Sequence, residues 1–131
     1  MADEPTKKKI LIIDDDTFLL DMYSLKFSQS GYAVDTALGS DQAYEKMKQG
    51  VAPDIFLTDI VMPGMDGFEL LEKLRAEKLL GNSVIIILSN RGQQVDVDRG
   101  TSLGADGYIV KASSTPSEVV AKVAEILLKK K

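Results

Sequence analysis

The chain has 131 residues, of which 44% are hydrophobic and 27% are charged, and these values match one globular domain. It contains no cysteine and no histidine, which excludes disulfide bonds, metal sites made from these residues and catalysis by a histidine base. Its net charge is −4, whereas domains that bind a nucleic-acid backbone are usually basic, so we expect no direct nucleic-acid binding.

The first apolar run, Ile10–Ile13, follows the lysine cluster Lys7–Lys9. With four residues it is too short for a signal peptide or a membrane span. We therefore expect no membrane association and a cytoplasmic protein. The lysine clusters at the two chain ends, Lys7–Lys9 and Lys129–Lys131, are interpreted as solvated termini.

Five short apolar runs alternate with segments that have helical features. The predicted strands are Ile10–Ile13, Ala33–Thr36, Ile55–Leu57, Val84–Leu88 and Tyr108–Val110. The predicted helices are Phe18–Ser30, Ser40–Gln49, Gly67–Leu80, Gly92–Gly104 and a last helix that begins after Thr115. This alternation predicts an α/β fold in which a five-stranded parallel sheet carries helices on both faces.

The predicted helices differ in the strength of their signals. Apolar spacing predicts the buried faces, which are Phe18, Met22 and Leu25 in the first helix and Phe68, Leu71 and Leu74 in the third. The fourth helix is weaker, because Gly100 within it costs about 1 kcal/mol relative to alanine. The last helix has a clear start, with Thr115 as N-cap and Glu118 as its capping-box partner.

Polar side chains stand at the carboxyl ends of four predicted strands. Asp14, Asp15 and Asp16 follow the first strand, Asp59 the third, Ser89 and Asn90 the fourth, and Lys111 the fifth. In an open parallel sheet these ends meet in the crevice where functional residues gather. One lysine cannot balance three carboxylates, which favours a hard divalent cation with oxygen ligands, and Mg²⁺ is the best match. Asp16 is interpreted instead as a helix N-cap or a solvated acid.

The set Asp14-Asp15, Asp59 within LTDIVMPGMDG, Ser89, Tyr108 and Lys111 resembles the receiver domain of two-component response regulators. The resemblance covers residues 8–129 in order, so we expect a single receiver domain over residues 1–131. It implies a doubly wound (βα)5 fold with the flavodoxin-like strand order 2-1-3-4-5. It also implies a signalling phosphoprotein, not an enzyme with a separate substrate, which catalyses only its own phosphorylation and dephosphorylation.

The resemblance further implies a role for each of these residues. Asp59 would accept a phosphoryl group as an aspartyl phosphate, and Lys111 would neutralise charge on that group. The implied Mg²⁺ ligands are Asp14, Asp15, Asp59 and the backbone carbonyl of Val61. Ser89 would hydrogen-bond the phosphoryl group and Tyr108 would turn inward with it, which switches the surface of the fourth helix, fifth strand and fifth helix.

The implied phosphoryl donor is a histidine kinase or a histidine phosphotransfer protein, and the implied output is a downstream effector protein or domain. The sequence identifies neither the kinase and its stimulus nor the output. It leaves open whether the chain is a stand-alone regulator or part of a longer one, and whether phosphorylation produces a dimer.

Two residues depart from the common family pattern. Ala112 stands where proline usually follows the lysine, often through a cis peptide bond, and the sequence does not decide the isomer here. Asn90 stands where a small alanine usually follows the hydroxyl. By analogy with the family, Val61 and Arg91 occupy the rim positions that govern the lifetime of the phosphoryl group, and neither side chain can accept a proton from water. We therefore expect slow self-dephosphorylation.

The alternative from another class is a haloacid dehalogenase-like phosphatase, which also uses a strand-end aspartate as nucleophile. Its signature is D-x-D-x-[TV], and the stretch from Asp14 fails it because Phe18 stands at the fifth position.

Overall fold

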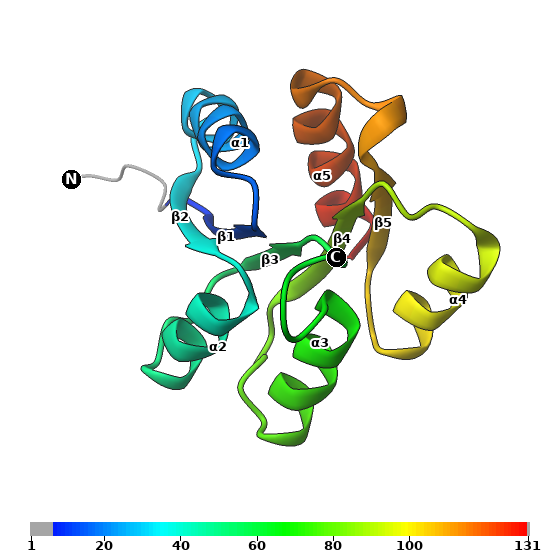
Figure 1. Ribbon diagram of the computed structural model, residues 1–131. Coiled ribbons are helices and arrows are strands. Elements are labelled where there is room, and N and C mark those ends of the chain that lie inside the picture. Colours follow the sequence, from blue (N-terminus) through cyan, green and yellow to red (C-terminus); the bar gives the residue numbers. More distant parts are fainter. Residues whose placement is uncertain (1–6, 131) are drawn as a thin grey trace.

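Five parallel strands form one sheet in the computed structural model, which describes residues 7–130 (Figure 1). The strands are β1 (Lys9–Asp14), β2 (Ala33–Leu38), β3 (Ile55–Thr58), β4 (Val84–Ser89) and β5 (Gly107–Val110). The helices are α1 (Thr17–Gln29), α2 (Ser40–Lys48), α3 (Gly67–Ala76), α4 (Gln94–Ser102) and α5 (Pro116–Lys130), with a short 3₁₀ helix at Lys111–Ser113. The sheet order is β2-β1-β3-β4-β5, so the predicted fold class and strand order are confirmed.

The sheet separates two apolar cores, because successive side chains of a strand point to opposite faces. Leu11 and Ile13 of β1 belong to the core that α2 and α3 cover. Ile10 and Ile12 belong to the core that α1 and α5 cover. Every residue of β3 and β4 is buried, as is every residue of β1 after Lys9, so these strands are covered on both faces.

The predicted buried face of α1 is wrong. Phe18 is 70% exposed and Leu25 is 58% exposed, whereas Leu20, Tyr23 and Phe27 form the face that packs on the sheet. Both stripes have helical spacing, and they lie on roughly opposite sides of the helix. Periodicity alone does not choose between them, and the helix turns two of its three aromatic side chains, Tyr23 and Phe27, inward while Phe18 stays exposed.

Side-chain caps fix the starts of three helices. Asp16 caps α1 by accepting the Leu19 N–H at 3.2 Å, which is one of the two roles expected for it. The predicted capping box of α5 is confirmed, because Thr115 Oγ1 accepts the Glu118 N–H at 3.2 Å and Glu118 accepts the Thr115 N–H at 2.8 Å. A further capping box starts α3 at Asp66. That helix ends at Ala76, before the predicted end, since Lys78 adopts a φ of 59° that a helix cannot continue.

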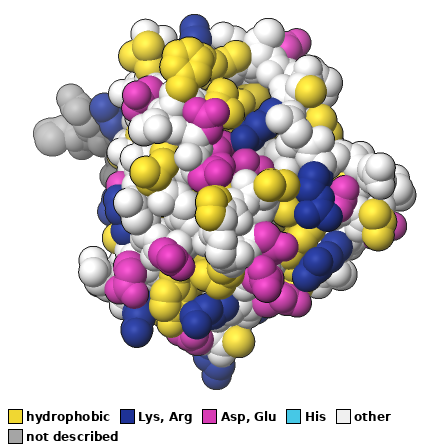
Figure 2. All heavy atoms as spheres, viewed as in Figure 1, with side chains coloured by type: hydrophobic (Ala, Val, Ile, Leu, Met, Phe, Trp, Pro, Cys, Tyr) yellow, Lys and Arg dark blue, Asp and Glu magenta, His cyan; other side chains and the backbone are white. Residues whose placement is uncertain are grey.

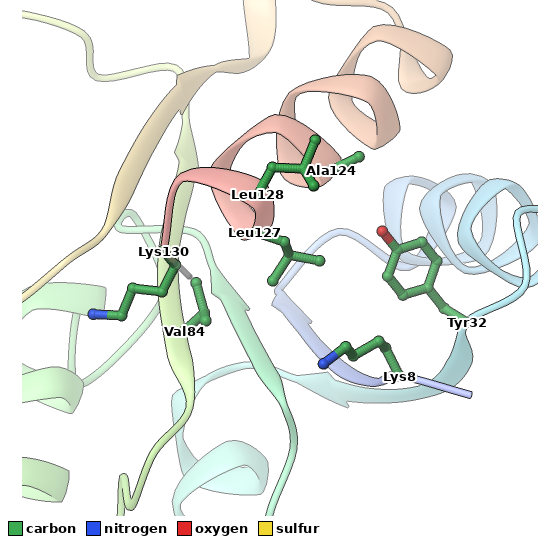
Figure 3. Close-up of a pocket in the computed structure, with 7 residues that line it drawn as sticks. All are labelled: Lys8, Tyr32, Val84, Ala124, Leu127, Leu128 and Lys130. Atoms are coloured by element: carbon green, nitrogen blue, oxygen red, sulfur yellow. The ribbon is translucent and has the colours of Figure 1, made fainter. Parts of the chain in front are cut away.

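A groove of about 420 Å³ lies at the amino-end edge of the sheet, between the end of α5 and the start of β2 (Figure 3). Val84 and Leu127 are among its apolar lining residues, and Lys8 and Tyr32 stand across from them. This groove lies at the edge opposite the carboxylates that end β1 and follow β3. Among residues 7–130, no helix combines the length and apolar character that a membrane crossing requires.

Gly67, the first residue of α3, allows the helix to start against the backbone of Asp59. A Cβ at this position would overlap the Asp59 carbonyl oxygen and lie 2.8 Å from the Ile60 Cα. Neither backbone atom can move without shifting the end of β3. The Gly67 N–H donates to the Ile60 carbonyl at 2.8 Å, which fixes the same close approach.

We expect Gly67→Ala to lower the free energy of unfolding by about 2 kcal/mol or more, because overpacking against backbone cannot relax cheaply. The matched control is Gly100→Ala in α4, where the new Cβ would meet the end of the Ile87 side chain at 2.7 Å. That side chain can move, and alanine gains about 1 kcal/mol in helix propensity. Urea unfolding of both variants measures the difference. Equal losses would show that the contact with the Asp59 backbone is not the cause.

Candidate functional site

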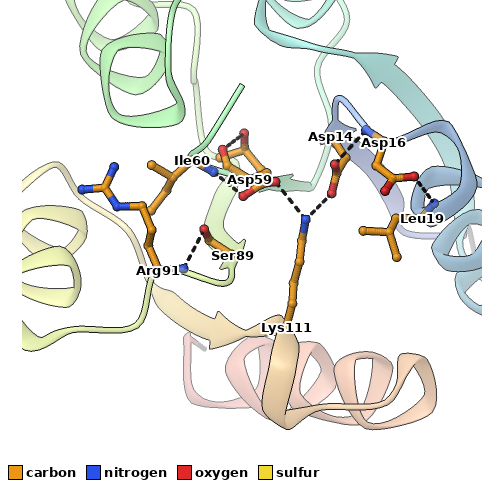
Figure 4. A network of polar contacts seen from close by, with 9 residues as sticks. Asp14, Asp16, Leu19, Asp59, Ile60, Ser89, Arg91 and Lys111 are labelled. Carbon is orange, nitrogen blue, oxygen red and sulfur yellow. Dashed lines mark hydrogen bonds and ion pairs between the residues drawn. The ribbon is translucent and has the colours of Figure 1, made fainter. Parts of the chain in front are cut away.

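The carboxyl ends of four strands bring their polar residues to one place (Figure 4). Asp14 is the last residue of β1, Asp59 follows β3, Ser89 is the last residue of β4 and Lys111 follows β5. Parallel registry of β1 with β3 and of β3 with β4 aligns these ends at the same edge of the sheet. The predicted meeting of these residues is therefore found in the structure.

Lys111 lies between two carboxylates. Its Nζ is 2.6 Å from Asp14 Oδ2 and 2.8 Å from Asp59 Oδ2. Burial lowers the pKa of Lys111, but the hydrogen bonds to Asp14 and Asp59 and the attraction of their charges outweigh it, so the net pKa shift is upward. Lys111 therefore stays protonated and offsets part of the repulsion between the two acids.

Backbone amides hold the remaining oxygens of the two acids. Asp14 Oδ1 accepts the Asp16 N–H at 3.0 Å, and Asp59 Oδ1 accepts the Ile60 N–H at 2.7 Å. Asp14 is only 2% exposed, and its burial raises the pKa of its carboxyl despite the bonds to Lys111 and Asp16. One lysine shared by two acids thus leaves the deeper one short of compensating charge.

Asp15 completes an acidic cluster at the surface. One carboxylate oxygen from each of Asp14, Asp15 and Asp59 lies within 4.8 Å of the others, and Asp15 is exposed while the other two are buried. Figure 2 shows acidic side chains gathered near the middle of this face of the molecule. Carboxylate oxygens at this spacing suit a hard cation such as Mg²⁺. Val61 lies two residues after Asp59, in the loop to α3, with its side chain 58% exposed.

The hydroxyl groups of Ser89 and Tyr108 both contact Arg91. Ser89 is 1% exposed, and its Oγ accepts the Arg91 N–H at 3.2 Å. The Tyr108 hydroxyl donates to the Arg91 carbonyl oxygen. Burial and the nearby Asp96 charge raise the pKa of Tyr108 to about 12, so this hydroxyl keeps its proton. This hydrogen bond joins Tyr108 of β5 to the loop before α4.

Arg91 does not point into the acidic cluster. Its guanidinium lies on the far side of Ser89 from Lys111 (Figure 4), and its Nη2 is 2.8 Å from Asp96 Oδ1. Sequence reasoning missed Asp96, which is 6% exposed in the first turn of α4. Two residues later stands Asp98, an exposed acid of the same type, so the sequence held no signal that set Asp96 apart.

The peptide bond between Lys111 and Ala112 is trans. Lys111 begins the short 3₁₀ helix that the sequence did not predict, and its side chain still reaches both Asp14 and Asp59. The departure from the family pattern at Ala112 therefore leaves the lysine in place.

The model of the response regulator receiver domain family matches residues 10–124. The alkaline phosphatase synthesis transcriptional regulatory protein PhoP of Bacillus subtilis is 36% identical over 120 residues, which cover 92% of this chain and 48% of that protein. The phosphate regulon transcriptional regulatory protein PhoB of Rhizobium meliloti is 34% identical over 123 residues, 94% of this chain and 53% of that protein. The chain thus spans about half the length of these curated relatives.

Solved structures of response regulators also resemble this chain. A CheY-like receiver domain protein from Methanospirillum hungatei superposes with a TM-score of 0.83 at 32% identity, covering 95% of this chain and 96% of that one. The chemotaxis response regulator CheY4 of Vibrio cholerae has the same TM-score at 27% identity, covering 92% and 99%. The haloacid dehalogenase-like alternative finds no support. The chain belongs to the receiver domain family of two-component response regulators.

Proposed function

We propose that Asp59 is the residue that accepts a phosphoryl group, in an Mg²⁺-dependent reaction with a phosphohistidine. The observation that carries this proposal is the position of the Asp59 carboxylate, 2.8 Å from the Lys111 ammonium and within 4.8 Å of carboxylate oxygens of the two further acids of the cluster. A carboxylate needs no deprotonation at neutral pH and is therefore ready to act as a nucleophile.

In the proposed step an Asp59 oxygen attacks phosphorus and forms a new P–O bond. The P–N bond to the donor imidazole breaks, its electron pair stays on nitrogen, and that nitrogen takes a proton from solvent. Lys111 neutralises negative charge on the transferred group, and the Ile60 N–H holds the second Asp59 oxygen in position. Ser89 Oγ is the nearby hydroxyl that would donate to a phosphoryl oxygen.

Asp14, Asp15, Asp59 and the Val61 carbonyl would hold the metal ion. Bound Mg²⁺ would supply the remaining charge neutralisation that phosphoryl transfer requires. The residues fit this ion because the cluster offers carboxylate oxygens within 4.8 Å of one another, at an edge that water can reach through the exposed Asp15.

The proposed donor is a histidine kinase or a histidine phosphotransfer protein in the cytoplasm. Exposed apolar side chains near the acidic cluster support such docking: Phe18 is 70% exposed at the start of α1 and Val61 is 58% exposed. The proposed output is a change in the surface of α4, β5 and α5, where Tyr108 lies, which an effector protein or domain would read. Residues 1–131 would act as a single receiver domain that catalyses only its own phosphorylation and dephosphorylation.

Asp59→Asn should abolish modification, because an amide cannot form the acyl phosphate. With acetyl phosphate and Mg²⁺, we expect mass spectrometry to find one added phosphoryl group on the wild type and none on the variant. Asp41→Asn, which changes an exposed acid in the first turn of α2, is the control and should be modified like the wild type. Full labelling of the Asp59→Asn chain at another residue would refute the assignment.

Asp15→Ala should weaken Mg²⁺ binding by about tenfold or more, since it removes a ligand. It should not destabilise the metal-free protein, because it also relieves repulsion in the cluster. The adjacent Asp16→Ala is the matched control: it should lose about 1 kcal/mol of stability with its N-cap and leave Mg²⁺ affinity unchanged. Calorimetric titration and urea unfolding measure both quantities. A metal-free loss of 1 kcal/mol or more in Asp15→Ala would contradict the repulsion argument.

Val61→Asn should shorten the lifetime of the phosphoryl group by about tenfold, equivalent to about 1.4 kcal/mol of barrier. The exposed valine offers no hydrogen bond to an attacking water, whereas asparagine can align one. Loss of radiolabelled phosphate from purified protein measures the rate, with Val61→Ile as a control that changes the side chain without adding a hydrogen-bonding group. A wild-type half-life of seconds, or no acceleration in Val61→Asn, would show that this position does not set the rate.

A further inference from the structure

Asp96 is a buried carboxylate that ties helix α4 to the preceding loop. It is 6% exposed, and its Oδ1 is 2.8 Å from Arg91 Nη2. A buried carboxylate without a cation partner is strongly unfavourable, so the position of the first turn of α4 depends on Arg91.

Helix α4 has few other anchors. Its N-cap, Gln93, makes no side-chain capping hydrogen bond, and Gly100 weakens its interior. The exposed Arg99–Glu72 pair has an N–O distance of 4.0 Å, too long to contribute much. Arg99 of α4 and Arg91 of the preceding loop also lie over the ring of Phe68 in α3, at 4.6 and 5.9 Å from its centroid.

Arg91 also contacts both hydroxyl residues of the proposed switch. Its N–H donates to Ser89 Oγ at 3.2 Å, and its carbonyl accepts the Tyr108 hydroxyl. The same residue is therefore joined to the phosphorylation site by its N–H, to β5 by its carbonyl and to α4 by its side chain.

We propose that the Arg91–Asp96 ion pair is a latch that holds α4 in the unmodified position and weakens when Asp59 is phosphorylated. The proposal rests on the function proposed above for Asp59 and adds how that site controls α4. When Ser89 turns to a phosphoryl oxygen and Tyr108 turns inward, the backbone of Arg91 loses its hydrogen bonds to both side-chain hydroxyls. The phosphoryl charge also attracts the guanidinium, so the ion pair to Asp96 is weaker in the modified protein.

Linkage makes the latch measurable at the phosphorylation site. If the pair favours the unmodified arrangement, then breaking it lowers the free energy that modification must supply, and a phosphoryl analogue binds more tightly. A merely structural role for Asp96 would lower stability without tightening the analogue. The sign of the affinity change therefore separates the two roles.

The experiment titrates the whole chain with beryllofluoride in the presence of Mg²⁺. Asp96→Asn keeps the shape of the side chain and removes its charge, and we expect its affinity for beryllofluoride to rise about fivefold or more. The double variant Arg91→Gln with Asp96→Asn should bind as tightly as Asp96→Asn alone, since the latch is already open. The control is Asp98→Asn, an exposed acid of α4 that pairs only with Gln94 among the hydrogen bonds of residues 7–130, and it should stay within twofold of wild type.

If Asp96→Asn bound beryllofluoride with an affinity within twofold of wild type, or more weakly, the latch proposal would be overturned. A double variant that returns to wild-type affinity would also overturn it, because the gain would then come from a freed Arg91 that reaches the analogue. If the wild-type chain bound no beryllofluoride, the proposed function of Asp59 would fail, and this outcome is distinct from a wild type that binds while Asp96→Asn shows no gain.

Discussion

The Lys111 ammonium is the group on which the arrangement of the site depends. It bonds both Asp14 and Asp59, and so it joins the ends of β1 and β3 to the residue after β5 across the intervening strand β4. Two carboxylates about 4 Å apart repel by roughly 4 kcal/mol at the effective dielectric of a protein surface. The lysine offsets this repulsion because it forms one short charge-assisted hydrogen bond to each carboxylate. It also sets the local positive charge that any transferred anion would meet.

Three neighbouring acids have three different environments because the chain leaves the sheet between them. Asp14 is the last strand residue and is buried, Asp15 is exposed at the turn, and Asp16 caps α1. Only the first needs the lysine. The exposed acid remains available as a ligand, and the third is used by the backbone of the helix. The repulsion among these three acids is therefore weaker than their adjacency in the sequence suggests.

Much of the fold and of the candidate site could be predicted from the sequence, because strand alternation, strand ends and helix caps are local signals. The apolar runs predicted the strands of the sheet, and the polar residues after Ile13, Thr58 and Val110 indicated the site. The phase of α1 could not be predicted, since two stripes share one period and tertiary packing selects between them. The Arg91–Asp96 pair could not be predicted either, because it depends on the path of the loop before α4. Pairing between a loop residue and a helix residue leaves no periodic trace in the sequence.

The two cores on opposite faces of the sheet share strands but no side chains. Helix α1 packs on one of them, whereas Leu103, which follows α4, and Tyr108 of β5 pack against the other. A change of α4 position therefore repacks atoms that α1 does not touch. If α1 recognises the donor and α4 carries the output, as proposed, residues on the two helices could be substituted independently, and one scaffold could acquire a new input without losing its output. The sheet separates the packing of α1 from the packing of α4, and the row of polar residues at its carboxyl edge is one structural link between the two faces.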